Sequence, residues 1–177
     1  MEVKSVFDYV IVGAGSAGCV LANRLTASGR NRVLLLEAGG EDKNLWVHIP
    51  IGYGKHFTNP KINWLYSSEP GEDWLKRRLI QPRGKIIGGT SSINGLIYMR
   101  GQREDYDLWR QLGNTGWSYE DVLPYFKKSE DQQRGADEYH GSGGPLAVSD
   151  PMEPHPMADA FIAAAQDAGH RRNDDFN

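Results

Sequence analysis

The pattern of apolar and turn-forming residues at the start of the chain predicts a strand, a helix and a second strand. Residues 7–12 (FDYVIV) form a short β-branched apolar run, and residues 32–37 (RVLLLE) form another. Residues 19–25, between them, have helical composition. Apolar positions recur at helical spacing on the face that we expect to pack inward, namely Ala17, Leu21 and Leu25. The order of these elements predicts a βαβ unit and an α/β fold.

The apolar periodicity weakens over residues 41–82, where proline and glycine alternate with aromatic side chains. Three tryptophans are more than a flexible linker carries. We therefore expect a partly ordered excursion whose tryptophan and tyrosine side chains, Trp74 among them, are packing anchors rather than a cage for a substrate.

Helical patterns return in the second half of the chain. Residues 103–112 predict one helix, and the capping-box sequence Ser118–Asp121 predicts the start of another that runs through Lys128. Residues 141–149 predict a turn followed by a strand. A last helix is predicted over residues 156–168, with a proline in its first turn and a glycine as its stop.

Composition narrows the class of protein. Hydrophobic residues make up 39% of the 177 residues and charged residues 24%, with a net charge of −3, which indicates a globular chain rather than a disordered polyelectrolyte. The sequence pI of about 5.9 argues against a nucleic-acid partner bound through bulk positive charge. Mean hydropathy is −0.56, and no apolar stretch approaches the length of a transmembrane segment.

The cysteine content and the N-terminal sequence indicate the cellular compartment of the protein. The single cysteine, Cys19, allows no internal disulfide and no cysteine-based zinc site, so we predict no metal centre. Its place in the first helix predicts a small buried side chain rather than a nucleophile. No secretory signal pattern is visible at the start of the chain, and we expect a cytoplasmic location.

Glycines cluster where the first predicted strand meets the first helix. Gly13, Gly15 and Gly18 fit the pattern Gly-x-Gly-x-x-Gly, and Glu37 stands at the end of the second strand. Such glycines allow a sharp turn, close approach of the backbone to a pyrophosphate, and tight packing of helix against strand. The N–H groups and dipole of the helix N-terminus favour phosphate charge, and Glu37 would accept hydrogen bonds from a ribose diol. The motif predicts dinucleotide binding, with either NAD or FAD as the ligand.

A second segment, residues 83–101 (RGKIIGGTSSINGLIYMRG), places glycines and small hydroxyl side chains on a backbone that a flat or anionic group could approach. By itself the segment would also suit a glycine-rich turn before a strand. Its GKxxGGTSSxN core resembles the first signature of the glucose–methanol–choline (GMC) family of FAD-dependent oxidoreductases. The stretches GAGSAGCVLANRL and LLLEAGG agree with this resemblance, which covers nearly the whole chain and points to choline-dehydrogenase-like members.

The resemblance implies an FAD cofactor and a set of residues that hold it. The pyrophosphate would lie against Gly13, Gly15, Ser16, Ala17 and Gly18, and the adenosine ribose against Glu37 and Ala38. The riboflavin and isoalloxazine part would lie along Ile86, Gly89, Asn94, Gly95, Leu96 and Ile97. In some relatives a histidine of this segment bonds covalently to the flavin. Because Ile93 and Asn94 stand in that region here, we expect non-covalent FAD.

The resemblance also implies an activity. In this family a small alcohol binds over the flavin, a histidine takes its hydroxyl proton, and a hydride moves to flavin N5. The expected reaction is oxidation of a primary alcohol, choline-like or another small alcohol, to an aldehyde. O₂ or a carrier would accept the electrons.

The chain would divide into two regions. Residues 1–150 would form a Rossmann-like FAD-binding region, made of the βαβ unit 7–40, the excursion 41–82, the signature 83–101 and the helices 103–128. Residues 151–177 would begin a substrate-binding α+β region. We expect both to be incomplete, with the C-terminal portion of the same enzyme as the missing partner.

No catalytic residue is predicted in this chain. The family's catalytic histidine belongs to a second signature near its C-terminus, which nothing in this sequence matches. The histidines at positions 48, 56, 140, 155 and 170 are not paired with a serine, cysteine or acid at catalytic spacing, so we expect surface or capping roles for them. Two alternatives stay open: an NAD-dependent dehydrogenase domain, in which the second motif has no role, and a non-catalytic flavin-binding fragment.

Overall fold

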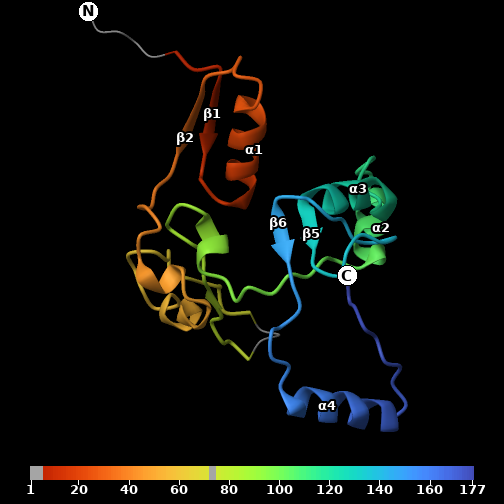
Figure 1. Ribbon diagram of the computed structural model, residues 1–177. Helices are drawn as coiled ribbons and strands as arrows, with labels where there is room; N and C mark the ends of the chain where they lie inside the picture. Colours follow the sequence, from red (N-terminus) through yellow and green to blue (C-terminus); the bar gives the residue numbers. More distant parts are fainter. Residues whose placement is uncertain (1–5, 72–74) are drawn as a thin grey trace, which may run out of the picture. The chain divides into compact units, whose positions relative to one another are not determined.

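The computed structural model describes residues 6–71 and 75–177, which form two compact units with the boundary between Ile97 and Tyr98 (Figure 1). Each unit is described by itself below. The predicted boundary at residue 150 separates an FAD-binding from a substrate-binding region, and it stays a prediction. Trp74, one of the predicted packing anchors, lies outside the described residues. No helix in the described part of the chain is long and apolar enough to cross a membrane.

The first unit opens with the predicted βαβ arrangement. It consists of β1 (Tyr9–Val12), α1 (Ser16–Thr26) and β2 (Val33–Leu36). The two strands pair in parallel, with Tyr9 opposite Val33 and Val12 opposite Leu36, and α1 lies alongside them (Figure 1). Just before the Tyr9–Val33 pair, the Asp8 carboxylate accepts a hydrogen bond from the Arg32 N–H at 2.7 Å. The parallel βαβ start is thus confirmed.

The face of α1 that packs inward differs from the predicted one. Gly18 is buried and Leu25 is half-buried, whereas Ala17 is exposed and Leu21 is 51% exposed. A Cβ built on Gly18 would lie 1.9 Å from the Gly13 carbonyl oxygen, so the closest approach of helix to loop follows the glycine. Because each helical residue turns the side-chain direction by about 100°, the next position points elsewhere. Cys19, predicted to be buried, is therefore exposed.

The glycine loop between β1 and α1 contacts the second glycine segment backbone to backbone. The Gly88 N–H donates to the Ala14 carbonyl at 2.7 Å, and Gly15 and Gly88 form an isolated parallel bridge. A Cβ on Gly89 would lie only 2.8 Å from the Gly15 Cα, and Gly89 has a φ of +58°. Neither the space nor the backbone conformation at Gly89 suits another residue.

The chain after β2 meets the same second segment in a similar way. The Ile87 N–H donates to the Gly40 carbonyl at 3.0 Å, and Gly40 bridges Ile86. A Cβ on Gly39 would lie 2.0 Å from the Lys85 carbonyl oxygen, whereas one on Gly40 would meet open space. Gly39 and Gly40 thus become neighbours of residues 85–87, which are distant in the sequence.

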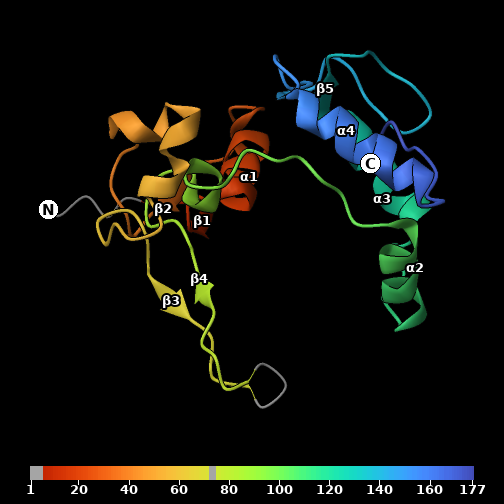
Figure 2. The same ribbon diagram turned by 90° about the horizontal axis from the view of Figure 1, so that it is seen from below.

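The excursion, residues 41–82, has a defined fold over the residues that the structure describes. It contains two 3₁₀ helices, η1 (Leu45–Val47) and η2 (Pro50–Lys55), and an antiparallel arm of β3 (Tyr66–Ser67) and β4 (Ile80–Gln81), seen in Figure 2. After the arm, residues 89–92 form a further 3₁₀ helix, η4 (Gly89–Ser92). The apolar core of the unit is small and consists of Ile62, Ile86 and Ile93, with Val47 against them.

Buried polar side chains hold the excursion together. The Asn63 amide donates to the His56 carbonyl at 3.1 Å, and its oxygen accepts from the Arg83 N–H at 3.1 Å. His56, for which we expected a surface or capping role, is 2% exposed, with its Nε2 3.1 Å from the Trp46 carbonyl oxygen. This expectation was wrong because the fold of the excursion, not its local sequence, surrounds the imidazole.

The second unit contains three helices and one pair of strands. They are α2 (Arg103–Gln111), α3 (Tyr119–Ser129), β5 (Glu130–Gln132), β6 (Leu146–Val148) and α4 (Pro156–Asp167). The helices and β6 match their predictions, while β5 was missed because its sequence, EDQ, is fully polar. β5 and β6 pair in parallel, with Glu130 opposite Leu146. Pro124 lies inside α3, where it removes one helical hydrogen bond.

Aromatic rings join α2 to α3. The Tyr106 ring lies 5.5 Å from that of Trp109, 6.2 Å from that of Tyr119 and 5.8 Å from that of Phe126. Tyr106 and Tyr119 are buried. Edge-on and tilted ring contacts of this kind add to the apolar burial and fix the two helices against each other.

The adjacent glycines 39 and 40 give a matched test of the backbone contact. We expect Gly39→Ala to lower the free energy of unfolding by about 1–3 kcal/mol, because the new methyl group must displace the Lys85 carbonyl. Gly40→Ala should change it by less than about 1 kcal/mol, since the added methyl group meets open space. Urea unfolding of both variants, followed by circular dichroism, makes the comparison; equal losses would contradict it.

The start of α3 gives a pH-dependent prediction. The Ser118 hydroxyl and then the Ser118 N–H donate to Asp121 and hold the pKa of this carboxyl below its ordinary value. Because the pKa is lowered, the charged carboxylate stabilises the folded chain at pH values above the ordinary pKa of about 3.9. This contribution is lost as the pH falls from there through the lowered pKa of the folded state.

We therefore expect Asp121→Asn to reduce the drop in melting temperature between pH 5 and pH 3, and Ser118→Ala to cost about 1 kcal/mol at neutral pH. Thermal melts across this pH range would show both effects. Ser149→Ala, an exposed serine outside the helix, is the control, and an equal loss there would contradict the capping role.

Candidate functional site

A cleft of about 620 Å³ lies in the first unit where the glycine loop, the end of β2 and the second glycine segment meet. Five residues predicted to bind the cofactor line it, namely Gly13, Gly15, Glu37, Ala38 and Gly89. The structure thus brings parts of both motifs to one place.

The glycine loop presents backbone donors at the start of α1. Gly13 has a φ of +96°, which only glycine adopts readily, and Gly15 is the extended N-cap with no side chain to occupy the helix end. The first N–H groups of a helix have no carbonyl partner within it, and the dipole of this 11-residue helix makes its start favourable for anions. Ser16 and Ala17 are exposed in this first turn.

Glu37 closes the cleft from the other side. One carboxylate oxygen accepts from the Ala14 N–H and the other from the Gly39 N–H, each at 2.8 Å. These bonds fix the half-buried carboxylate between the glycine loop and the chain after β2. Because a carboxylate has about four acceptor positions, two remain for a diol in the cleft.

An aromatic wall completes the cleft and was missed as part of a site by sequence reasoning. Trp64 and Tyr66 stack with ring centroids 5.9 Å apart and planes within 4°, and both line the cleft with Arg83. The two rings are 41% and 51% exposed, so they are not the packing anchors that we expected. Their i, i+2 spacing, which places both on one face of an extended segment, was the available signal.

The remaining predicted flavin residues lie outside this cleft. Ile86 has no exposed surface, because its side chain is in the apolar core with Ile62 and Ile93. The other four form an exposed stretch of irregular chain, namely Asn94, Gly95, Leu96 and Ile97. The roles assigned to these residues by the family resemblance stay predictions.

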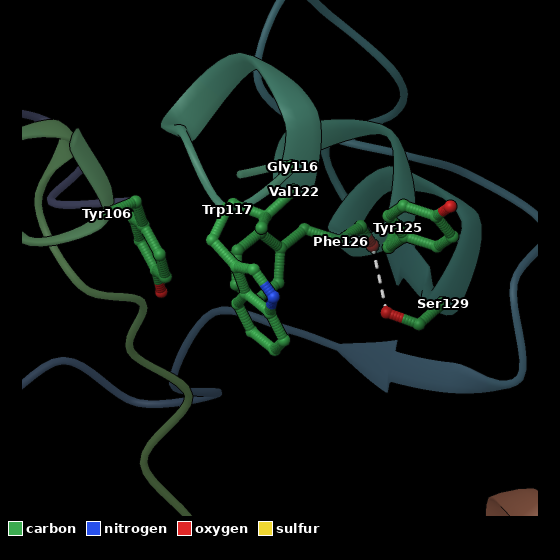
Figure 3. A pocket seen from close by; sticks show the side chains of 7 residues that line it. All are labelled: Tyr106, Gly116, Trp117, Val122, Tyr125, Phe126 and Ser129. Carbon is green, nitrogen blue, oxygen red and sulfur yellow. Dashed lines mark hydrogen bonds between the residues drawn. The ribbon is translucent and has the colours of Figure 1, made fainter. Parts of the chain in front are cut away.

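The second unit carries a separate apolar groove of about 580 Å³ on α3 (Figure 3). It is lined by Tyr106, Gly116, Trp117, Val122, Tyr125, Phe126 and Ser129. The Ser129 hydroxyl donates to the Phe126 carbonyl at 2.9 Å and is thus already used within the helix. The lining holds no carboxylate, imidazole or amine that could act as an acid or base.

The histidines offer no base to the cleft. His155 is confirmed as a cap, since its Nδ1 accepts from the Met157 N–H at the start of α4. His140, expected at the surface or at a helix end, is instead 4% exposed and lies 3.1 Å from the Glu130 carboxylate. No histidine is among the described residues that line the cleft. Within residues 6–71 and 75–177, no group of three metal-binding side chains was found.

Known proteins are similar to this chain in sequence and in fold. The sequence profile of the GMC oxidoreductase family matches residues 7–177. The oxygen-dependent choline dehydrogenase of Photobacterium profundum is 45% identical over 98% of this chain, and an alcohol dehydrogenase [acceptor] of Pseudomonas putida is 46% identical over 97%. In both cases the chain spans 31% of the length of the relative.

Solved structures agree with the sequence comparison. Pyridoxine 4-oxidase from Mesorbium loti superimposes with a TM-score of 0.85 at 37% identity, covering 92% of this chain and 32% of that one. A formate oxidase gives a TM-score of 0.83 at 27% identity, covering 96% and 32%. The match of the profile over nearly the whole sequence, together with this shared fold, shows that the chain belongs to the GMC oxidoreductase family and corresponds to its N-terminal part.

Proposed function

We propose that this chain binds FAD non-covalently as the N-terminal portion of an enzyme that oxidises a primary alcohol to an aldehyde. The observation that carries the proposal is the contact of the two glycine motifs, through Gly15, Gly88 and Gly89, at one cleft that Glu37 closes. A dinucleotide needs this combination of bare backbone, helix N-terminus and fixed carboxylate. The GMC family to which the chain belongs uses FAD.

The residues present fit the adenosine diphosphate half of FAD. The start of α1 offers backbone donors to the two phosphates, and the Glu37 carboxylate offers acceptors to the ribose hydroxyls. Trp64 and Tyr66 offer a flat apolar surface in the same cleft. When bound, FAD supplies the hydride acceptor at N5. The residues of this chain bind and orient the FAD.

A non-covalent attachment is supported by the sequence of the second motif. Histidine and cysteine, which could bond to the flavin ring, are both absent from residues 83–101. Ile93, in the region where some relatives carry the linking histidine, is 2% exposed in the apolar core. Neither an imidazole nor a thiol is thus available to the flavin in this segment.

The proton-accepting base would come from the portion of the enzyme that follows this one in its relatives. The chain spans about a third of their length, and none of its described histidines lines the cleft. The names of the relatives support an alcohol as substrate, with choline or another small primary alcohol both compatible. O₂ or a carrier would take the electrons.

Binding of the nicotinamide cofactor NAD is the second candidate, because the first glycine motif alone would allow it. The second motif favours FAD: its glycines form part of the cleft wall and have no role in an NAD-binding βαβ unit.

Ligand titration tests the cofactor. The purified chain should quench the fluorescence of added FAD, while NAD⁺ in excess should not compete. We expect Glu37→Gln to weaken FAD binding about tenfold or more, because it removes a charged acceptor for the ribose diol. Glu41→Gln, a carboxylate four residues away that pairs with Lys43, is the matched control and should bind as the parent does.

The same sample tests the attachment. Acid precipitation of the protein should leave all flavin in the supernatant, and yellow colour in the pellet would contradict the non-covalent proposal. Tight binding of NAD⁺ together with no binding of FAD would contradict the flavin proposal.

A turnover assay tests whether the chain binds the flavin but needs another portion of the enzyme for catalysis. The chain saturated with FAD should show no choline-dependent reduction of a redox dye, because no base lines its cleft. Adding the C-terminal two thirds of the Photobacterium profundum choline dehydrogenase should restore measurable turnover if this chain supplies the flavin cradle. Alcohol oxidation by the chain alone would contradict the prediction.

A further inference from the structure

The last helix of the second unit, α4, is largely apolar, yet none of its residues is buried. Its sequence, PMADAFIAAAQD, has polar side chains only at Asp159, Gln166 and Asp167. Met157 is 68% exposed and Phe161 is 76% exposed. A helix that is apolar on most of its surface is ordinarily covered by other chain.

The apolar side chains of α4 form one broad face. Because each residue turns the side-chain direction by about 100°, Met157, Phe161 and Ala164 lie in the middle of this face. Asp159 and Gln166 lie on the opposite side of the helix. The helix thus has a distinct apolar face, centred on Met157 and Phe161, and a polar side that suits solvent.

The ends of α4 are specified by local sequence rather than by packing. His155 Nδ1 accepts from the Met157 N–H at 3.1 Å, Pro156 stands at the first helical position, and Gly169 follows the helix with a φ of +92°. Such signals define where a helix begins and ends, but a helix of twelve residues is only marginally stable in water without packing. A partner for the apolar face would supply the missing stability.

Arg134 ties together the two segments that flank α4 (Figure 1). Its guanidinium donates to the Asp150 carboxylate at 2.9 Å and 2.5 Å, and to the Asp175 carboxylate at 3.2 Å. Asp150 precedes the helix and Asp175 follows it, so residues 151–174 form a loop that one side chain closes at its base. Restraint at both flanks reduces the conformational entropy that the helix loses when a partner docks.

The relatives of this chain indicate which partner covers α4. The Photobacterium profundum choline dehydrogenase aligns with 98% of this chain, an alignment that leaves out only a few residues and therefore includes α4. This chain spans 31% of that enzyme, so about two thirds of its length lie outside the aligned part. The apolar groove on α3 is not the partner, because no residue of α4 is among the described residues that line it.

We propose that the apolar face of α4 is a docking surface for the portion of the enzyme that follows this one in its relatives. The partner is a polypeptide with a complementary apolar surface. Since α4 carries Asp159 and Asp167 but no cation, the rim of the partner surface would be neutral or basic. The proposal rests on that part of the proposed function which makes this chain the N-terminal portion of a longer enzyme, and it does not depend on FAD.

Hydrogen exchange measured by mass spectrometry tests the docking. The sample is a single polypeptide, in which this chain is followed by the C-terminal two thirds of the Photobacterium profundum choline dehydrogenase; it is called the fusion below. We expect the amides of residues 156–167 to exchange about tenfold or more slowly in the fusion than in this chain alone. Burial of the apolar face would make local opening of the helix less favourable.

Two serine variants of the same helix separate the apolar face from the polar side. Phe161→Ser should remove most of the added protection in the fusion and leave the melting temperature of the chain alone nearly unchanged, because this side chain is exposed there. Gln166→Ser, on the opposite side, is the matched control and should leave the exchange in the fusion as it was. The change in intrinsic helix propensity is small in both variants.

Three results would overturn the proposal. The first is equal exchange of α4 in the fusion and in the chain alone. The second is a clear loss of melting temperature when Phe161→Ser is made in the chain alone, which would show that α4 is already covered within this chain. The third is a dimer of the chain alone, seen by sedimentation, that Phe161→Ser dissociates, since a second copy would then be the partner.

The docking and the cofactor can fail separately. A fusion in which α4 is protected but which binds no FAD would refute the flavin part of the proposed function and leave the docking surface intact. If the fusion does not fold, the same measurement on the Photobacterium profundum enzyme decides. Slow exchange in its segment aligned with residues 156–167 supports the proposal, and exchange as fast as in this chain alone overturns it.

Discussion

The first unit depends on a contact that excludes side chains. Backbone meets backbone where Gly15 approaches Gly89 and where Gly39 approaches Lys85, at separations that a Cβ would reduce to 2.8 Å and 2.0 Å. The cleft follows from these approaches, because each brings part of the first βαβ unit against residues 84–89. A residue with a side chain at either place would push the second motif away from the first.

The same glycines explain the chemistry of the cleft. A bare loop leaves the N–H groups at the start of α1 facing the cleft, and the close fit lets the Glu37 carboxylate bond to Ala14 and Gly39 at once. Glycine thus serves the fold and the site together. In the proposed function a glycine at such a position is constrained twice, by its neighbours in the protein and by the ligand.

The second unit uses a different principle. Its helices α2 and α3 are joined by aromatic rings around Tyr106, and its polar strand β5 carries the buried Glu130, which binds Arg100 in the interior. Such a pair adds little net stability but costs much if one partner is lost, so it fixes geometry more than it stabilises.

The sequence by itself determined the βαβ start, the capping box of α3, the His155 cap and the family. Each of these depends only on the spacing of residues close in sequence or on a continuous motif. Only the tertiary structure decided which face of α1 is covered, why Cys19 is exposed, and that His56 and His140 are buried. It also turned Trp64 and Tyr66 from expected anchors into a wall of the cleft. The reason is physical: local pattern sets backbone conformation, whereas burial depends on which distant segment comes close, and in this chain the glycine contacts decide that.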